Sequence, residues 1–172
     1  MEREYTIGIV VENKSGVLAH IAGLFSGHGF NIKELSVGET ENPEYSRMTI
    51  VVKGDDQIVE QIKKQLHKFI DVLKVFDLTG VPSVHREIIL LKVSAPPQKR
   101  QEIFTIAEIF KGKVVDISHE TLILEVTGTE GKIEAIIEIL TPYGIIEIAR
   151  TGRVSISRGA RGTAHAGGKK NG

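Results

Sequence analysis

Seven consecutive residues near the amino terminus have the chemistry to bind a small anion. They are Glu12-Asn13-Lys14-Ser15-Gly16-Val17-Leu18, and they join a predicted strand to a predicted helix. The first amides of a helix have no partner within the helix and carry a partial positive charge, so they attract a carboxylate. Gly16 lets a ligand approach the backbone closely, and Asn13 can offer its amide oxygen to an ammonium group. This combination suits a small zwitterion.

Asn31, which is followed by Ile32, could complete such a site only from another place in the fold. It lies at the far end of the same predicted helix, so it would have to reach the ligand from elsewhere in the fold or from a second subunit. A simpler interpretation is that Asn13, Ser15 and Gly16 only form a turn and a helix cap, with Ser15 as the N-cap. The residue types alone favour this simpler interpretation.

No pattern in the sequence is typical of catalysis, phosphate binding or metal binding. The stretch from Gly128 to Lys132 is too short for the G-x-x-x-x-G-K-[ST] motif, and Ile133 stands where that motif needs a hydroxyl group. The six histidines lack any close ligand spacing, and there is no cysteine. Neither G-x-S-x-G nor Ser-x-x-Lys occurs. We therefore predict a chain with no catalytic residues, no metal and no cofactor of its own.

The composition predicts a folded protein whose partners are recognised locally. Of the 172 residues, 41% are hydrophobic, and the 22 basic side chains balance the 22 acidic ones. Without net charge, no overall field draws the chain to nucleic acid or to a membrane surface. No apolar run reaches the roughly 18 residues of a membrane span, and the start lacks the features of a secretory signal. We predict a cytoplasmic protein that binds neither nucleic acid nor membranes.

The elements that must position the Glu12 to Leu18 stretch follow from periodicity. Apolar residues alternate in the predicted strands and recur at helical spacing in the predicted helices. We predict, in order, a strand over 5–11, a helix from Val17 that ends at Gly27-His28-Gly29, strands over 30–37 and 46–53, a helix over 58–69 and a strand over 72–78. This βαββαβ order, with two helices on one face of four strands, predicts a ferredoxin-like sandwich.

The same order of elements begins again after the turn-forming segment 79–83. We predict a strand over 88–93 that Pro96-Pro97 breaks, a helix over 103–110, strands over 114–118 and 122–126, a helix from Thr129 or Glu130 to Leu140, and a strand over 145–148. The predicted fold class is α+β, with two consecutive ferredoxin-like βαββαβ domains over 1–79 and 84–157. The glycine-rich, basic segment 158–172 is predicted to be a flexible tail.

Several runs along the whole chain resemble one protein family. They are Glu12 to Leu18, Gly29-Phe30-Asn31-Ile32, Ser46-Arg47-Met48-Thr49-Ile50, Gln61 to Lys68, Arg86-Glu87, Glu108 to Gly112, Ala149-Arg150-Thr151-Gly152 and Ser157-Arg158-Gly159. With these runs the sequence closely resembles the small regulatory subunit of acetolactate (acetohydroxyacid) synthase. The first domain alone would indicate only an ACT domain, and the later runs carry the more specific resemblance. The long tail and the Pro96-Pro97 break depart from the more familiar members.

The resemblance implies an amino-terminal ACT domain that forms a homodimer and binds a branched-chain amino acid, usually valine, between the two copies. It implies an effector site of Asn13, Gly16, Val17 and Leu18 from one chain with Asn31 and Ile32 from its neighbour. It also implies a partner, the large catalytic subunit, which carries thiamine diphosphate, magnesium and FAD. The small subunit would activate that thiamine-diphosphate-dependent transferase and confer feedback inhibition in valine, leucine and isoleucine biosynthesis.

The sequence leaves two other classes of function open. A free-standing ACT-domain amino-acid sensor that regulates a different enzyme would bind valine without any effect on acetolactate synthesis. An enzyme in its own right is the weakest alternative, because the sequence shows no nucleophile, metal site or acid–base pair.

Overall fold

The computed structural model describes residues 3–160, which divide into two units. The first unit contains the described residues up to Val84 together with those from Ser155 onward, and the second contains His85–Val154. Each unit has its own hydrophobic core. Most of the segment predicted to be a flexible tail, residues 161–172, lies outside the described residues. Within residues 3–160, no helix is both long and apolar enough to cross a membrane.

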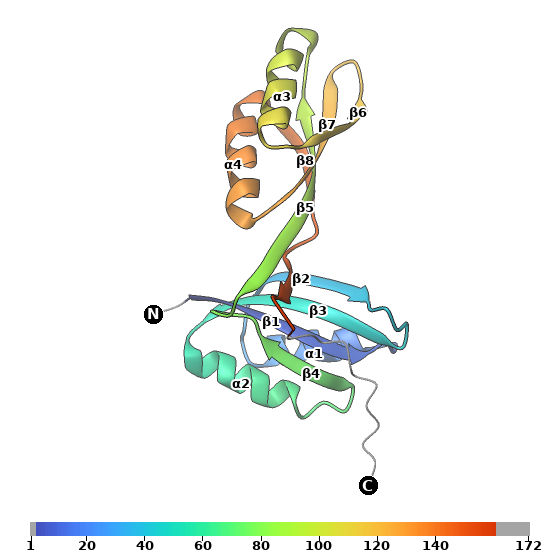
Figure 1. Cartoon of the computed structure of the whole chain (residues 1–172), viewed down its shortest axis with the longest axis vertical. Coiled ribbons are helices and arrows are strands. Elements are labelled where there is room, and N and C mark those ends of the chain that lie inside the picture. Colours follow the sequence, from blue (N-terminus) through green and yellow to red (C-terminus); the bar gives the residue numbers. More distant parts are fainter. Residues whose placement is uncertain (1–2, 161–172) are drawn as a thin grey trace. The chain divides into compact units, whose positions relative to one another are not determined.

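The first unit has the predicted βαββαβ order. Its elements are β1 (Arg3–Glu12), α1 (Val17–Gly27), β2 (Ile32–Glu39), β3 (Tyr45–Gly54), α2 (Asp56–Leu66) and β4 (Val72–Asp77). The strands form an antiparallel sheet in the order β2-β3-β1-β4, and both helices pack on one face of that sheet (Figure 1). The ferredoxin-like prediction is therefore confirmed for this unit.

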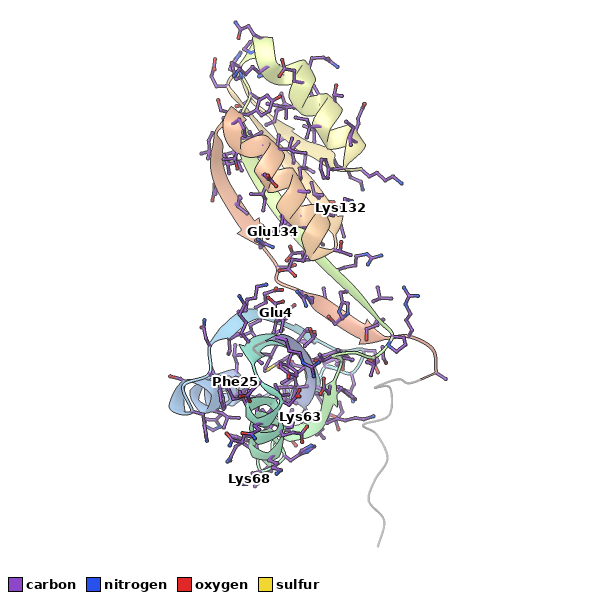
Figure 2. All side chains as sticks on the ribbon, turned by 90° about the vertical axis from the view of Figure 1, so that its left-hand side faces the viewer. Glu4, Phe25, Lys63, Lys68, Lys132 and Glu134 are labelled. Atoms are coloured by element: carbon purple, nitrogen blue, oxygen red, sulfur yellow. The ribbon has the colours of Figure 1, made fainter. Side chains whose placement is uncertain are left out.

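Alternation along the strands explains the core of the first unit. Ile7 and Ile9 on β1 and Ile50 on β3 face the helices and are completely buried. From α1, Ile21 and Phe25 reach the same core, and Figure 2 shows Phe25 inside the unit. The sheet and the two helices thus hold the β1–α1 connection on a rigid base.

The opposite face of the sheet also holds buried residues, and Ser155 contacts Arg47 on that face. Arg47 on β3 donates a hydrogen bond from Nη2 to the Ser155 carbonyl oxygen at 2.7 Å, and its guanidinium lies 5.5 Å from the centre of the Phe76 ring. Burial lowers the pKa of Arg47 below its ordinary value. Ser155 belongs to β9 (Val154–Ser157), a strand that the sequence did not predict and that pairs with β5.

The second unit repeats the order of elements. It contains most of β5 (Ser83–Ser94), then α3 (Pro97–Ile109), β6 (Lys113–Ile117), β7 (Thr121–Gly128), α4 (Glu130–Leu140), the short 3-10 helix η1 (Thr141–Tyr143) and β8 (Ile145–Arg150). The sheet order is β6-β7-β5-β8, with the helices on one face (Figure 1). Helix α3 begins at Pro97 rather than near Ile103, because proline suits the first position of a helix. The second ferredoxin-like prediction is confirmed.

One charged cluster is partly buried in the second unit. Glu87 on β5 is only 3% exposed, and it accepts a hydrogen bond from Arg150 Nη2 at 2.6 Å. Arg150 also donates from Nη1 to Glu134, which Figure 2 labels on α4, at 2.8 Å. Burial lowers the pKa of Arg150, but the hydrogen bonds to Glu134 and Glu87 outweigh it, so the pKa lies above its ordinary value. The arginine therefore keeps its charge and neutralises the buried carboxylate.

Candidate functional site

The turn between β1 and α1 depends on the left-handed conformation of Gly16. Its φ angle is 88°, a value that residues other than glycine rarely adopt. No atom lies within 4 Å of the position that a Cβ would occupy. Gly16 is also the N-cap residue of α1, and no side chain caps the helix. The prediction that Ser15 is the N-cap was therefore wrong, because the tight turn at Gly16 places the start of the helix one residue later.

The start of α1 leaves backbone amides available. The Gly16 carbonyl accepts from His20 N at 3.0 Å, and Val17 N donates weakly to the Lys14 carbonyl at 3.4 Å. Among residues 3–160, the amides of Leu18 and Ala19 donate no hydrogen bond. These two N–H groups lie at the positive end of an 11-residue helix. Together they can bind a carboxylate.

Three hydrogen bonds hold Asn13 against the turn between β2 and β3. Its side-chain Nδ2 donates to Glu39 Oε1 at 3.0 Å and to the Pro43 carbonyl at 2.9 Å, while its backbone N–H donates to the Glu44 carbonyl at 2.7 Å. Both hydrogens of the amide are used, so its oxygen remains free to accept from a ligand. The three residues that support Asn13 were not predicted, because they come from a hairpin that follows much later in the chain.

Lys14, in the same turn, has a largely exposed side chain. It forms an ion pair with Glu12, and the hydrogen bond to that carboxylate raises the pKa of Lys14 above its ordinary value. The ion pair offsets the charge of Lys14. The amides of α1 are therefore the better candidates for binding a carboxylate.

A single chain brings four of the six predicted site residues together. Asn13, Gly16, Val17 and Leu18 lie within six consecutive residues, and the side chain of Val17 is buried in the core while that of Leu18 is 45% exposed. Asn31 and Ile32 follow the other end of α1. At about 1.5 Å per residue, an 11-residue helix separates the two groups by roughly 16 Å. A ligand the size of valine cannot span this distance.

Comparisons with known proteins agree with the two-unit fold. The family model "AHAS small subunit-like ACT domain" matches residues 7–74, and the model "Small subunit of acetolactate synthase" matches residues 86–159. The "probable acetolactate synthase small subunit" of Archaeoglobus fulgidus is 53% identical over 156 residues, which cover 91% of this chain and 98% of that protein. The chain belongs to the acetolactate synthase small-subunit family. The resemblance predicted from the sequence is confirmed.

Two further acetolactate synthase small subunits support this assignment. That of Aquifex aeolicus is 55% identical over 157 residues, which cover 91% of this chain and 82% of that protein. The crystal structure of the small subunit from Thermotoga maritima has a TM-score of 0.85 and 45% identity, and the match covers 91% of this chain and 98% of that one. As an acetolactate synthase small subunit, the chain has an ACT domain and, by implication, a catalytic subunit as its partner.

Within the part of the chain that the structure describes, no group of three or more histidine, aspartate or glutamate side chains is arranged to hold a metal ion. That thiamine diphosphate, magnesium and FAD belong to the catalytic partner stays a prediction.

Proposed function

We propose that this small subunit activates the catalytic subunit of acetolactate synthase and inhibits it when valine, or another branched-chain amino acid, binds to a homodimer of ACT domains. One observation carries the proposal. In a chain of this family, the free amides of Leu18 and Ala19 belong to the same β1–α1 connection as Asn13, whose amide oxygen is available. Donors for a carboxylate and an acceptor for an ammonium group are what a free amino acid requires.

Each part of the proposed site has a distinct role. The amides at the start of α1 bind the carboxylate of valine, and Asn13 Oδ1 accepts from its ammonium group. The exposed side chain of Leu18 and Ile32 of the partner subunit enclose the isopropyl group. Asn31 of the partner subunit supplies a further polar contact. The separation of the two groups of residues along α1 within one chain supports a site that needs two chains.

The expected affinity suits a sensor of metabolite concentration. Burying a side chain of the size of valine contributes about 1.5–3 kcal/mol, and each charge-assisted hydrogen bond contributes about 1.5–3 kcal/mol. After the cost of ordering the ligand and the loop is subtracted, binding falls in about the micromolar to millimolar range.

Reconstitution with the catalytic subunit tests the proposed function. We expect the rate of acetolactate formation to rise when this chain is added to a cognate catalytic subunit with its cofactors, and to fall again when valine is added. Leucine and isoleucine are compared in the same assay to rank the effectors. If the chain binds valine but never changes the rate with any cognate catalytic subunit, the alternative of a free-standing sensor is favoured.

Mixing two defective chains tests whether the site needs two subunits. We expect neither Gly16→Asp nor Asn31→Ala homodimers to bind valine normally. In a mixed dimer, one site carries both substitutions and the other carries neither. Random mixing makes about half of the dimers mixed, so normal affinity should return at about a quarter of all sites. Titration calorimetry measures this stoichiometry, and two different affinity tags verify that mixed dimers form. Mixed dimers without restored binding would contradict the shared site.

A further inference from the structure

The orientation of the Asn13 amide is fixed by groups that can only accept hydrogen bonds. The Glu39 carboxylate and the Pro43 carbonyl have no hydrogen to donate, so the edge of the amide that faces them must be its NH₂ group. The oxygen then points elsewhere and can only accept. An asparagine without such partners could present either its oxygen or its NH₂ group to a ligand.

From this geometry we propose that Glu39 is a positioning residue that makes the effector site select ligands with an ammonium group. Glu39 binds Asn13 Nδ2, which leaves Asn13 Oδ1 as the acceptor that faces the ligand. Valine carries an ammonium group and satisfies this acceptor. Its 2-oxo acid, 3-methyl-2-oxobutanoate, has the same carboxylate and isopropyl group but carries a carbonyl oxygen instead, which cannot donate. The inference rests on the proposed valine site.

The turn that supports Asn13 is itself braced by hydrogen bonds. Thr40 N donates to the Tyr45 carbonyl at 3.0 Å, and Glu44 N donates to Asn42 Oδ1 at 3.0 Å. These bonds hold the Pro43 and Glu44 carbonyls in place, and Glu39 is the last residue of β2. The acceptors that orient Asn13 thus come from a rigid hairpin rather than from a mobile side chain alone, so the selectivity is built into the fold.

Selectivity between valine and its 2-oxo acid provides the test. The full-length chain is titrated with each ligand by calorimetry, for the native protein and for Glu39→Ala, Glu39→Gln and Glu41→Ala. Glutamine keeps an acceptor for Asn13. Glu41 is a matched control, because it lies on the same hairpin and makes no hydrogen bond or ion pair among the described residues. Thermal unfolding of each variant verifies that it is folded.

We expect Glu39→Ala to weaken valine binding about threefold to tenfold and to reduce the preference for valine over the oxo acid by a similar factor. Glu39→Gln and Glu41→Ala should keep both affinities within about twofold of the native values. An unchanged preference in Glu39→Ala overturns the inference, as does an equal loss for both ligands or a Glu39→Gln variant that behaves like Glu39→Ala. A native chain that does not bind valine overturns the proposed site itself, which distinguishes the two failures.

Discussion

Replacing Gly16 with aspartate is expected to weaken valine binding at least about tenfold while activation of the catalytic subunit is retained. No atom lies within 4 Å of the added Cβ position, so the new side chain meets no neighbour, and the only steric cost is the backbone strain of a φ angle of 88°. Its carboxylate would instead repel the carboxylate of valine, at a cost of roughly 1–4 kcal/mol for two charges about 4 Å apart near a protein surface. Valine titration of the full-length chain and valine inhibition of the reconstituted enzyme measure the effect.

Gly16→Asn is the matched control for this substitution. Asparagine has nearly the same size as aspartate and tolerates the φ angle of 88° better than most residues, but it carries no charge. We expect it to bind valine much more tightly than Gly16→Asp. Equal losses in the two variants would assign the effect to the backbone turn, and normal valine inhibition in Gly16→Asp would contradict a carboxylate at the start of α1.

Replacing Arg150 with alanine is expected to lower the free energy of unfolding by about 2–4 kcal/mol, because it leaves a buried carboxylate without its counter-charge. Glu87 is 3% exposed and loses the guanidinium that binds it at 2.6 Å. The side chain of Arg150 is 35% exposed, which places the loss below that of a fully buried pair. Urea denaturation followed by circular dichroism measures the change.

Two variants decide whether Glu87 is the reason for that loss. Glu134→Ala removes the more exposed partner of Arg150 and should cost less than about 1 kcal/mol. The double variant Glu87→Gln/Arg150→Met removes both charges and should recover much of the stability. If Arg150→Ala costs no more than Glu134→Ala, the pairing of Arg150 with the buried glutamate does not stabilise the second unit.

Hydrophobic periodicity could predict both βαββαβ units because apolar residues recur at strand or helix spacing in their elements, although Val115 and Ile117 on β6 and Ile146 on β8 are half exposed or more. Strand β9 shows why one strand was missed. Its apolar residues Val154 and Ile156 are 49% and 58% exposed, whereas Ser155 between them is 2% exposed. The pattern is inverted relative to a normal core strand, since a polar residue packs inward and its carbonyl accepts from Arg47. The alternation of Val154, Ser155, Ile156 and Ser157 is only four residues long, and it would place the wrong side chains inward.

The sequence could predict only part of the candidate site, because some of its residues are marked by local signals and others are set by the folded sheet. Asn13 and Gly16 are marked by their residue types, because a glycine at a turn and an asparagine beside a helix start are local signals. The partners of Asn13 are set by the register of the sheet, in which Glu12 lies opposite Tyr45 and Glu39 lies opposite Ser46. That register depends on the folded hairpin, so the role of Glu39 could not be derived from spacing alone.

The second unit is an insertion in the first unit, because the chain leaves the first unit after Val84 and returns to it at Ser155. During synthesis, Arg47 emerges from the ribosome long before the carbonyl that it binds. At typical rates of about 5–20 residues per second, the segment between Arg47 and Ser155 takes roughly 5–21 s to make. Throughout that interval the ACT sheet lacks this acceptor for Arg47. A chain that ends within the second unit therefore lacks the Ser155 carbonyl, and its first unit forms without the hydrogen bond that joins Arg47 to β9.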